Sequence, residues 1–527
     1  MKNVTAAEFY KDYNQLPNRI YLYGASVTGQ GILQILEGLG MNIEAFADKN
    51  KSKCQNGFCG YKVILPQDIP EDACVIITTS SAHIASVDKM LTEEYKIANV
   101  YYFPFESFVV KQPFFLNGYD NNQEAVYEEQ YQQMIERYDS IEIYPMWADR
   151  IGEFIYRYMI MQEDVKRKSN NTCCVILPYV IGDVSYANTR LMDIISRQAQ
   201  MIYQHNEEFW AYVIERHITK LEFCNTYFHT IEAYNKMAEL PWKEAMHYLQ
   251  NSSPVVQFSK EEEKEAQEKM ERLGIREPFV CVFARDSAYL SQRSGDFDYH
   301  DYRDYDINNF HLLADYLKEK NIQVIRVGAQ QNGQLVGDNV VDITNEKYDA
   351  LLDLYVNSRC SWWLGSNCGS ENISALFRKK KINVNVSLIV DTFWEVPYCV
   401  ESCCRYIPKL YFSVKEERYL SLREMCLLNL SDAQPYLYEE KYQVTLKENS
   451  AEDILDLFRE CEQIENGTWQ YTEEEKFLQE KYQMILIDIY KEHPDSLSGY
   501  TYTVKQSVPV LPIGSSFLKK YSDILLK

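Results

Sequence analysis

The sequence predicts an α/β protein with three Rossmann-like parallel-sheet units and a helical C-terminal tail. Short apolar runs alternate with segments of helical spacing in three series, over residues 1–110, 169–275 and 276–430. Strands that alternate with helices along a chain are typical of parallel sheets covered by helices. The chain of 527 residues is longer than one hydrophobic core usually supports, so several domains are expected.

The composition is acidic and excludes several classes of partner. Lys and Arg number 54 against 77 Asp and Glu, which gives a net charge of −23. A chain of this charge repels phosphate polymers and anionic lipid, so no nucleic-acid partner is expected. No run of about 18 apolar residues occurs, and the N-terminal segment lacks the apolar core of a signal peptide. We therefore expect a cytoplasmic protein, with at most peripheral contact at the inner membrane face.

Cysteine and histidine patterns give no metal site. The 14 cysteines form no regular framework, and free thiols in a reducing compartment are expected. The run Cys399–Cys404 lacks the paired spacing and histidine partners of a zinc site. A D-x-D triad at Asp296–Asp298 follows a polar segment, so a solvated mobile loop is favoured over a Mn²⁺ site. No metal and no obligatory cofactor are predicted, and the oligomeric state is left open.

The first unit begins with a strand over Ile20–Tyr23 and a glycine-containing turn, "GASVTGQG". A helix, a second strand over 43–47 and a third over 73–79 follow. Within the turn, serine replaces the glycine that would approach a pyrophosphate most closely, and an acid ends the second strand. Two hypotheses stay open: a nucleotide or NAD site, or a structural or regulatory unit that keeps the turn for close packing. The candidate residues are Gly24, Ser26, Gly29, Gly31 and Asp48.

Residues 111–168 are polar with helical spacing and predict a helical connector. The second unit, 169–275, opens with a strand over 173–178 that runs into the loop Ile181-Gly182-Asp183. A carboxylate at the carboxyl end of a parallel strand suits an active site, whereas Asp183 equally suits a helix N-cap. The segment Ser259–Ile275 has a serine start, an acidic first turn and a glycine stop, which predict a capped surface helix.

The third unit, 276–430, carries polar and small residues after successive strands. Strands are predicted over 279–284, 323–327, 360–364 and 381–386, and residues 431–527 form the helical tail that packs back on these units. Arginine suits a diphosphate because its planar fork bonds two oxygens, and a helix start adds backbone N–H donors. These strand ends predict a nucleotide-diphosphate site. Its candidate residues are Arg285, Asp286, Tyr289, Arg303, Arg326, Gly328, Ser366, Asn367, Gly369, Ser370 and Glu371.

From about residue 173 onward the chain resembles a family of predicted bacterial glycosyltransferases that are encoded with surface-polysaccharide genes. The resemblance is carried by "ARDSAYL", "HDYRDYDINNF", "VIRVG", "LDLYVNSRCSWWLGSNCGS", "ENSAEDILDLF" and "PIGSSFLKKY". It covers about two-thirds of the chain and leaves the first unit outside. The resemblance implies that the last two Rossmann-like units form a GT-B glycosyltransferase, which uses a nucleotide sugar without an obligatory metal.

The loop at Asp183 is similar to the first loop of heptosyltransferase-type enzymes. That similarity implies that Asp183 is the general base for an acceptor hydroxyl of a glycan or lipid-linked glycan. Two alternatives remain: a non-catalytic nucleotide-sugar sensor or scaffold, and an NAD-dependent sugar-nucleotide enzyme that uses the first unit. The sugar, the nucleotide, the acceptor and the stereochemical outcome are not predicted.

Overall fold

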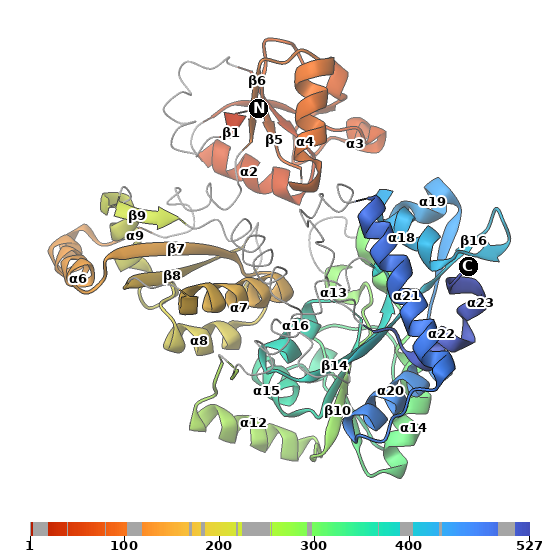
Figure 1. Cartoon of the computed structure of the whole chain (residues 1–527). Coiled ribbons are helices and arrows are strands. Elements are labelled where there is room, and N and C mark those ends of the chain that lie inside the picture. The colour runs from red at the N-terminus through yellow and green to blue at the C-terminus, as the bar shows by residue number, and fades with distance from the viewer. Residues whose placement is uncertain are drawn as a thin grey trace. The chain divides into compact units, whose positions relative to one another are not determined.

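The structure is a computed structural model of the whole chain (Figure 1). Its contacts divide into two compact units: residues 1–187 with 195–232, and residues 188–194 with 233–527. The residues that the structure describes are 2–3, 19–38, 41–79, 81–102, 118–167, 171–180, 185–217, 220–223, 253–254, 256–291, 298–366, 368–389, 404–431, 435–493 and 512–527.

The N-terminal sheet has six parallel strands in the order β1-β6-β5-β2-β3-β4. Alternate residues of its central strand enter different cores: Ile20 and Leu22 on one face, Tyr21 and Tyr23 on the other. The strand order reverses between β2 and β5. The strands are β1 (Lys2–Asn3), β2 (Ile20–Tyr23), β3 (Ile43–Ala47), β4 (Val63–Ile64), β5 (Cys74–Ile77) and β6 (Asn99–Tyr102), and the helices are α2 (Val27–Gly38), α3 (Lys51–Asn56) and α4 (Ser81–Lys89).

A second sheet of the same unit has three parallel strands in the order β8-β7-β9. Its apolar residues Ile143 and Val175 share one core with Trp210 and Val213 of helix α9. The strands are β7 (Ser140–Trp147), β8 (Thr172–Tyr179) and β9 (Leu221–Phe223), and the helices are α6 (Glu124–Arg137), α7 (Ile151–Arg167), α8 (Thr189–Gln198) and α9 (Glu207–His217).

Strand β7 corrects the prediction of a wholly helical connector over 111–168. It pairs with β8 along its whole length, from Ser140 opposite Thr172 to Trp147 opposite Tyr179. The pattern was missed because the run "SIEIYPMW" contains an acid and a proline, which are uncommon in a central strand. The structure accommodates Glu142 because the Tyr144 hydroxyl donates a hydrogen bond to its carboxylate.

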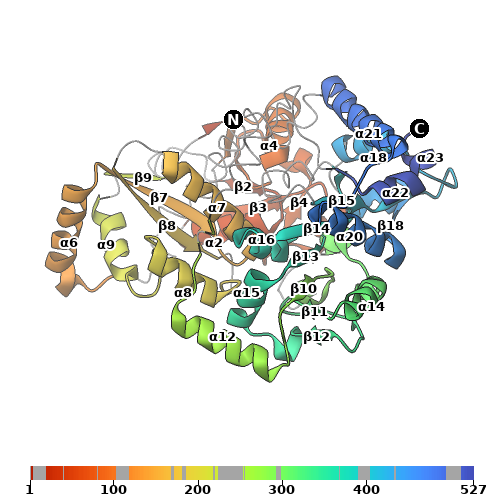
Figure 2. The ribbon, with the colours of Figure 1, turned by 60° about the horizontal axis from the view of Figure 1, so that its bottom comes forward.

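The sheet of the second unit has six parallel strands in the order β12-β11-β10-β13-β14-β15. Helices α14 and α15 cover opposite faces (Figure 2), and Val280 and Cys281 of β10 accordingly enter different cores. The strands are β10 (Phe279–Val282), β11 (Gln323–Arg326), β12 (Val340–Asp342), β13 (Trp362–Gly365), β14 (Lys380–Val386) and β15 (Arg405–Pro408), and the helices are α12 (Lys260–Arg272), α13 (Ala288–Ser291), α14 (His311–Glu319), α15 (Ala350–Arg359) and α16 (Gly369–Leu376).

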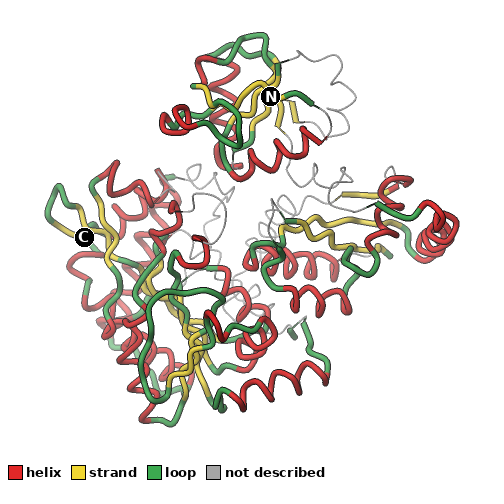
Figure 3. Tube along the Cα trace, turned by 180° about the vertical axis from the view of Figure 1, so that it is seen from behind, coloured by secondary structure: helices red, strands yellow, loops and turns green. Residues whose placement is uncertain are grey.

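The C-terminal segment is mainly helical (Figure 3) and packs on this same sheet. Phe458, Tyr482 and Phe517 share a core with Val282 of β10 and Ile382 of β14. A three-stranded antiparallel sheet, β17-β16-β18, precedes most of these helices. The elements are β16 (Leu410–Ser413), β17 (Arg418–Tyr419), β18 (Val444–Lys447), α18 (Leu422–Ser431), α19 (Tyr438–Tyr442), α20 (Ala451–Glu465), α21 (Glu473–Glu492), α22 (Ser515–Lys520) and α23 (Ser522–Leu525).

Helix starts follow the sequence signals closely. Ser259 Oγ accepts from the Glu262 amide at 3.2 Å, and the Glu262 carboxylate accepts from the Ser259 amide at 2.9 Å. This reciprocal capping box satisfies two donors that the helix itself leaves unpaired. The predicted capped helix is therefore confirmed as α12. Capping boxes also begin α20 at Ser450 and α21 at Thr472.

Candidate functional site

The candidate site lies where the strand order of the second unit reverses. The chain runs from β10 outward to β11 and β12, then returns to place β13 on the other side of β10. In open parallel sheets, ligands bind in the crevice outside the carboxyl ends of the strands at such a reversal. The segments that follow β10 and β13 are therefore the place to look for binding groups.

The two strand ends approach each other closely. The Phe283 amide donates to the Leu364 carbonyl at 2.9 Å, which extends the pairing of β10 with β13. A Cβ atom on Gly365 would lie 2.8 Å from the Phe283 carbonyl oxygen, so only glycine fits at the end of β13. This contact sets Arg285, two residues further along, beside the loop that opens helix α16.

Arg285 is the central cation of the site. Its side chain is 8% exposed, and its Nη1 donates to the Asp304 carboxylate. Nη2 of the same guanidinium is buried and has no hydrogen-bond partner within the described residues. A buried polar atom without a partner is costly, so an unpaired arm of this kind indicates a place for an acceptor oxygen.

Asp304 and Arg303 set the charge around Arg285. Burial raises the pKa of the Asp304 carboxyl to about 6, and the nearby Arg285 opposes this rise. Burial lowers the pKa of the Arg285 guanidinium, and the charge of Arg303 lowers it further. Two guanidinium groups thus lie close enough to repel each other, and an anion placed between them would relieve that repulsion.

Helix α16 presents its N-terminus to these cations. The side chain of the N-cap residue Cys368 makes no capping hydrogen bond to the first turn of this helix. Burial raises the pKa of its thiol to about 12, so the sulfur near the Ser370 and Glu371 amides is neutral. Ser370 Oγ is buried and has no hydrogen-bond partner in the described parts of the chain. Backbone amides with only a weak sulfur acceptor, together with a free hydroxyl, suit a phosphate group.

The loop that carries Arg303 is held in place by hydrogen bonds from a buried lysine. Lys409 is 3% exposed, and its Nζ donates to the carbonyl oxygens of Tyr302 at 3.1 Å and Asp304 at 2.5 Å. Ser387 Oγ donates to the same Tyr302 carbonyl at 3.0 Å. Burial lowers the pKa of the Lys409 amine to about 8. These contacts hold the backbone on both sides of Arg303.

Three predicted donor residues have structural roles instead. Arg326 is 1% exposed, and its guanidinium donates to Gln331, to the carbonyls of Asn332 and Gly333, and to Asp342. It is enclosed by its own loop, so the prediction that it binds a phosphate is wrong for this structure. Glu371 is also buried and pairs with Lys381, which is itself 2% exposed.

Asp286 likewise supports the fold. Its Oδ1 accepts from the Ala288 amide at 2.9 Å, and its Oδ2 accepts from the Asn332 amide at 2.6 Å. The carboxylate therefore joins helix α13 to the loop after β11.

Gly328 takes a positive φ of 116° in the loop after β11, which favours glycine there. Tyr289 lies partly buried on α13. Asp183 and Asn367 lie outside the described residues, so their predicted roles stay predictions.

The turn of the first unit is closed by its own side chains. Asp48 Oδ2 accepts from the Ala25 amide at 3.0 Å, and its Oδ1 accepts from the Asn50 amide at 2.9 Å. Lys53 Nζ donates to the Ala25 carbonyl at 2.7 Å. The carboxylate is engaged with backbone rather than turned toward a ribose, which corrects the role predicted for Asp48.

The glycines of this turn serve close packing. A Cβ atom on Gly29 would lie 2.2 Å from the Gly24 carbonyl oxygen, and Gly24 itself has a φ of 118°. Ser26 Oγ donates to the Thr78 carbonyl at 3.3 Å, and Thr78 donates to the Gly24 carbonyl at 2.8 Å. Gly31 lies within α2. These contacts favour the structural hypothesis for the turn.

The most informative residues that sequence reasoning missed are Asp304, Cys368 and Lys409. Asp304 and Cys368 lie within motifs that were already singled out, whereas Lys409 lies outside all of them. Their roles depend on burial and on partners far away in the chain, which a single sequence does not display. The described residues contain no group of three or more His, Cys, Asp or Glu side chains arranged to hold a metal ion. No helix in the described ranges has the length and apolar character to cross a bilayer.

The strand order defines a doubly wound α/β sheet, and Arg285 and the start of helix α16 follow the two strands that flank its topological switch point. No protein-family model matches the sequence, and no curated protein matches it. Among solved structures, the chain is similar to a glycosyl transferase of family 9 from Veillonella parvula, with 8% identity over 47% of this chain and 81% of that chain and a TM-score of 0.28.

It is also similar to the E. coli ADP-heptose LPS heptosyltransferase II, with 10% identity over 62% of this chain and 99% of that chain and a TM-score of 0.33. A UDP-GlcNAc 2-epimerase from Neisseria meningitidis gives 12% identity over 73% of this chain and 89% of that chain, with a TM-score of 0.19. All three similarities combine low identity with a low TM-score.

Proposed function

We propose that this chain is a metal-independent glycosyltransferase of the GT-B type. It transfers a sugar from a nucleotide-diphosphate donor to a hydroxyl group of a surface glycan or a related acceptor. The observation that carries this proposal is the unpaired, buried Nη2 of Arg285 beside the start of helix α16, at the point where the strand order reverses.

The same groups suit the chemistry of the leaving group. Negative charge grows on the nucleoside diphosphate as the bond to the sugar breaks, and fixed cations stabilise that charge without reorganising. Arg285 would bond one phosphate oxygen through Nη2, while the α16 amides and Ser370 Oγ would bond another. Arg303 would supply a second positive charge from its clamped loop.

An acceptor hydroxyl must lose a proton during the transfer. We propose Asp183 as the base, because it follows strand β8 in the sequence and a carboxylate after a parallel strand suits this role. Glu142 is buried within β7 and bonded by Tyr144, so it is not an alternative. The second candidate function is a nucleotide-sugar sensor, which would use the same anion site without turnover.

The test is nucleotide binding and donor turnover by the full chain. UDP, GDP and ADP are titrated by calorimetry, and release of the nucleoside diphosphate is followed with the matching sugar nucleotides. Arg285→Ala should weaken nucleotide binding at least tenfold, because it removes a charged hydrogen bond in a desolvated site. Arg272→Ala is the matched control, since Arg272 is an exposed arginine on α12. Unchanged affinity in Arg285→Ala would overturn the donor site, and binding without turnover would favour the sensor.

A further inference from the structure

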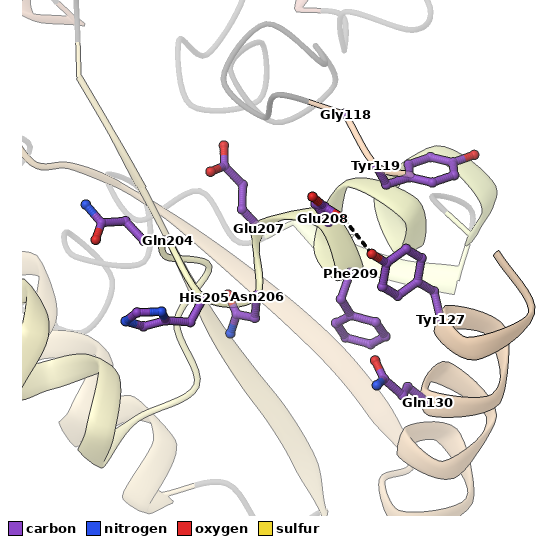
Figure 4. A pocket seen from close by; sticks show the side chains of 10 residues that line it. All are labelled: Gly118, Tyr119, Tyr127, Gln130, Gln204, His205, Asn206, Glu207, Glu208 and Phe209. Carbon is purple, nitrogen blue, oxygen red and sulfur yellow. Dashed lines mark hydrogen bonds between the residues drawn. The ribbon is translucent and has the colours of Figure 1, made fainter. Parts of the chain in front are cut away.

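A second pocket, separate in chemistry from the anion site, lies in the first unit (Figure 4). It has a volume of about 550 Å³ and is formed by the segment before helix α6, by α6 itself, and by the loop before α9 with the first turn of that helix. Its volume is in the range of small-ligand sites, about 300–1,000 Å³. The residues that define its character are Tyr119, Tyr127, His205, Glu207, Glu208 and Phe209.

Aromatic rings form one wall of the pocket, and they are held in place. Tyr127 lies 6.2 Å from Tyr119 in an edge-on arrangement and 6.4 Å from Phe209, measured between ring centroids. The Tyr127 hydroxyl donates to the Glu208 carboxylate at 2.6 Å, as Figure 4 shows. The Tyr119 hydroxyl lies 3.3 Å from Glu215. Rings ordered in this way present apolar faces at little entropic cost on binding.

The electrostatic character of this pocket is opposite to that of the anion site. Glu207 and Glu208 line it, and no lysine or arginine is among its described lining residues. The hydrogen bond to Glu208 raises the pKa of Tyr127 to about 12, so this phenol keeps its proton at neutral pH. Phosphates, nucleotides and acidic sugars would be repelled here.

The remaining lining groups are neutral hydrogen-bonding side chains. Gln130 and Gln204 are exposed at the pocket, and their side-chain amides make no hydrogen bond to other described residues. Each amide offers donors and an acceptor, which together match the hydroxyl groups of a polyol. Apolar ring faces, carboxylates and amides without cations form a surface that a neutral saccharide fits better than an anionic ligand.

We propose that this pocket binds a neutral oligosaccharide segment through the Tyr127 and Phe209 rings. Saccharide binding here goes beyond the donor site and does not depend on it. Its assignment to the acceptor glycan rests on the proposed glycosyltransferase function. The pocket would then hold a stretch of the glycan chain at a place remote in sequence from the donor site.

The experiment titrates the full chain with maltohexaose, cellohexaose and chitohexaose, with hexagalacturonate as the anionic comparison. Calorimetry and ligand-observed NMR should detect binding of at least one neutral probe. Tyr127→Ala and Phe209→Ala should each weaken that binding at least tenfold and leave UDP affinity unchanged. Gln130→Ala with Gln204→Ala tests the same surface through exposed side chains whose loss leaves the core intact. Phe477→Ala, at a ring 62% exposed on α21, is the aromatic control.

Several outcomes would overturn the proposal. Failure of all three neutral probes to bind at millimolar concentration would do so, as would tighter binding of hexagalacturonate. Binding that persists at full strength in Tyr127→Ala, Phe209→Ala and the glutamine pair would place the saccharide elsewhere. If UDP binding also fails in the unaltered chain, the proposed transferase falls while a positive saccharide result still stands.

Discussion

Arg285 and Asp304 form a partly buried ion pair that uses only one arm of the guanidinium. Nη1 donates to the carboxylate, whereas Nη2 has no partner within the described residues. Asp304 therefore fixes the plane of the fork without saturating it. Such a half-paired arginine is oriented before a ligand arrives, which lowers the entropic cost of binding an oxyanion.

Replacing Arg285 by lysine tests whether one arm of the guanidinium holds Asp304 while the other binds the ligand. A lysine ammonium is a point charge and lacks the planar fork, so it can face Asp304 or the ligand but not both in the same geometry. Arg285→Lys should weaken UDP binding about 10- to 100-fold although the charge is kept. Calorimetric titration at constant ionic strength measures the change. Wild-type affinity in this variant would mean that the unpaired Nη2 has no part in binding.

Replacing Lys409 by methionine tests the clamp under the Arg303 loop. The substitution keeps the length of the side chain but removes the donors to the Tyr302 and Asp304 carbonyls. UDP binding should weaken about tenfold because the Asp304 carbonyl loses this partner, the Tyr302 carbonyl keeps only Ser387 Oγ, and the backbone beside Arg303 is held less firmly. The free energy of unfolding, measured in urea, should change by less than the free energy of UDP binding. Removing a buried charge offsets part of the loss of these hydrogen bonds. Lys441→Met, on the exposed face of α19, is the control.

Seven strands of the doubly wound sheets could be predicted from the sequence, for a physical reason: β2, β3, β5, β10, β11, β13 and β14. The other five were not predicted. Buried parallel strands such as β5 and β10 are continuous apolar runs, and helices such as α12 carry complete capping signals. Strand β7 was missed because Glu142 and Pro145 interrupt its apolar pattern. The pairing of β7 with β8 allows Glu142 and Pro145 in a strand, and this pairing is a feature of the folded state only.

The sequence predicts where the site lies, but not which of the residues there are available to a ligand. Arg285 and the start of α16 follow directly from the rule that ligands meet the carboxyl ends of parallel strands. Arg326 ends the neighbouring strand β11 at the same edge of the sheet, yet the loop that follows folds back and encloses it. Nothing local distinguishes these two arginines. The difference lies in which loop supplies acceptors, and that is decided by contacts between residues far apart in the sequence.

Replacing Gly29 by alanine tests the structural hypothesis for the first turn. The new Cβ atom would meet the Gly24 carbonyl oxygen, since the two would be 2.2 Å apart. The free energy of unfolding should fall by about 2–4 kcal/mol, because backbone on both sides of the contact must shift. Gln30→Ala, the next residue on α2, is the control. UDP affinity should stay unchanged, and a parallel loss of UDP binding would instead assign the nucleotide site to the first unit.

Asp353 gives a prediction for the pH dependence of stability. It lies on α15, is 3% exposed, and accepts a hydrogen bond from Asn357 Nδ2 at 3.4 Å. Burial raises the pKa of this carboxyl from 3.8 to about 7. The folded state therefore binds more protons than the unfolded chain between about pH 4 and pH 7. Across this window the contribution of Asp353 to stability falls as the pH rises, and it is constant above pH 7.

Asp353→Asn keeps the shape of the protonated carboxyl and removes the titration. The free energy of unfolding of this variant, measured relative to wild type, should rise by up to about 4 kcal/mol between pH 4 and pH 7. Asp349, at the N-cap of the same helix, has a pKa lowered by the Lys269 ammonium and backbone amides despite partial burial. Asp349→Asn should therefore lose stability relative to wild type as the pH rises through 4. Urea unfolding at half-unit pH intervals measures both series, and slopes of the same sign for the two variants would contradict the assigned burial of Asp353.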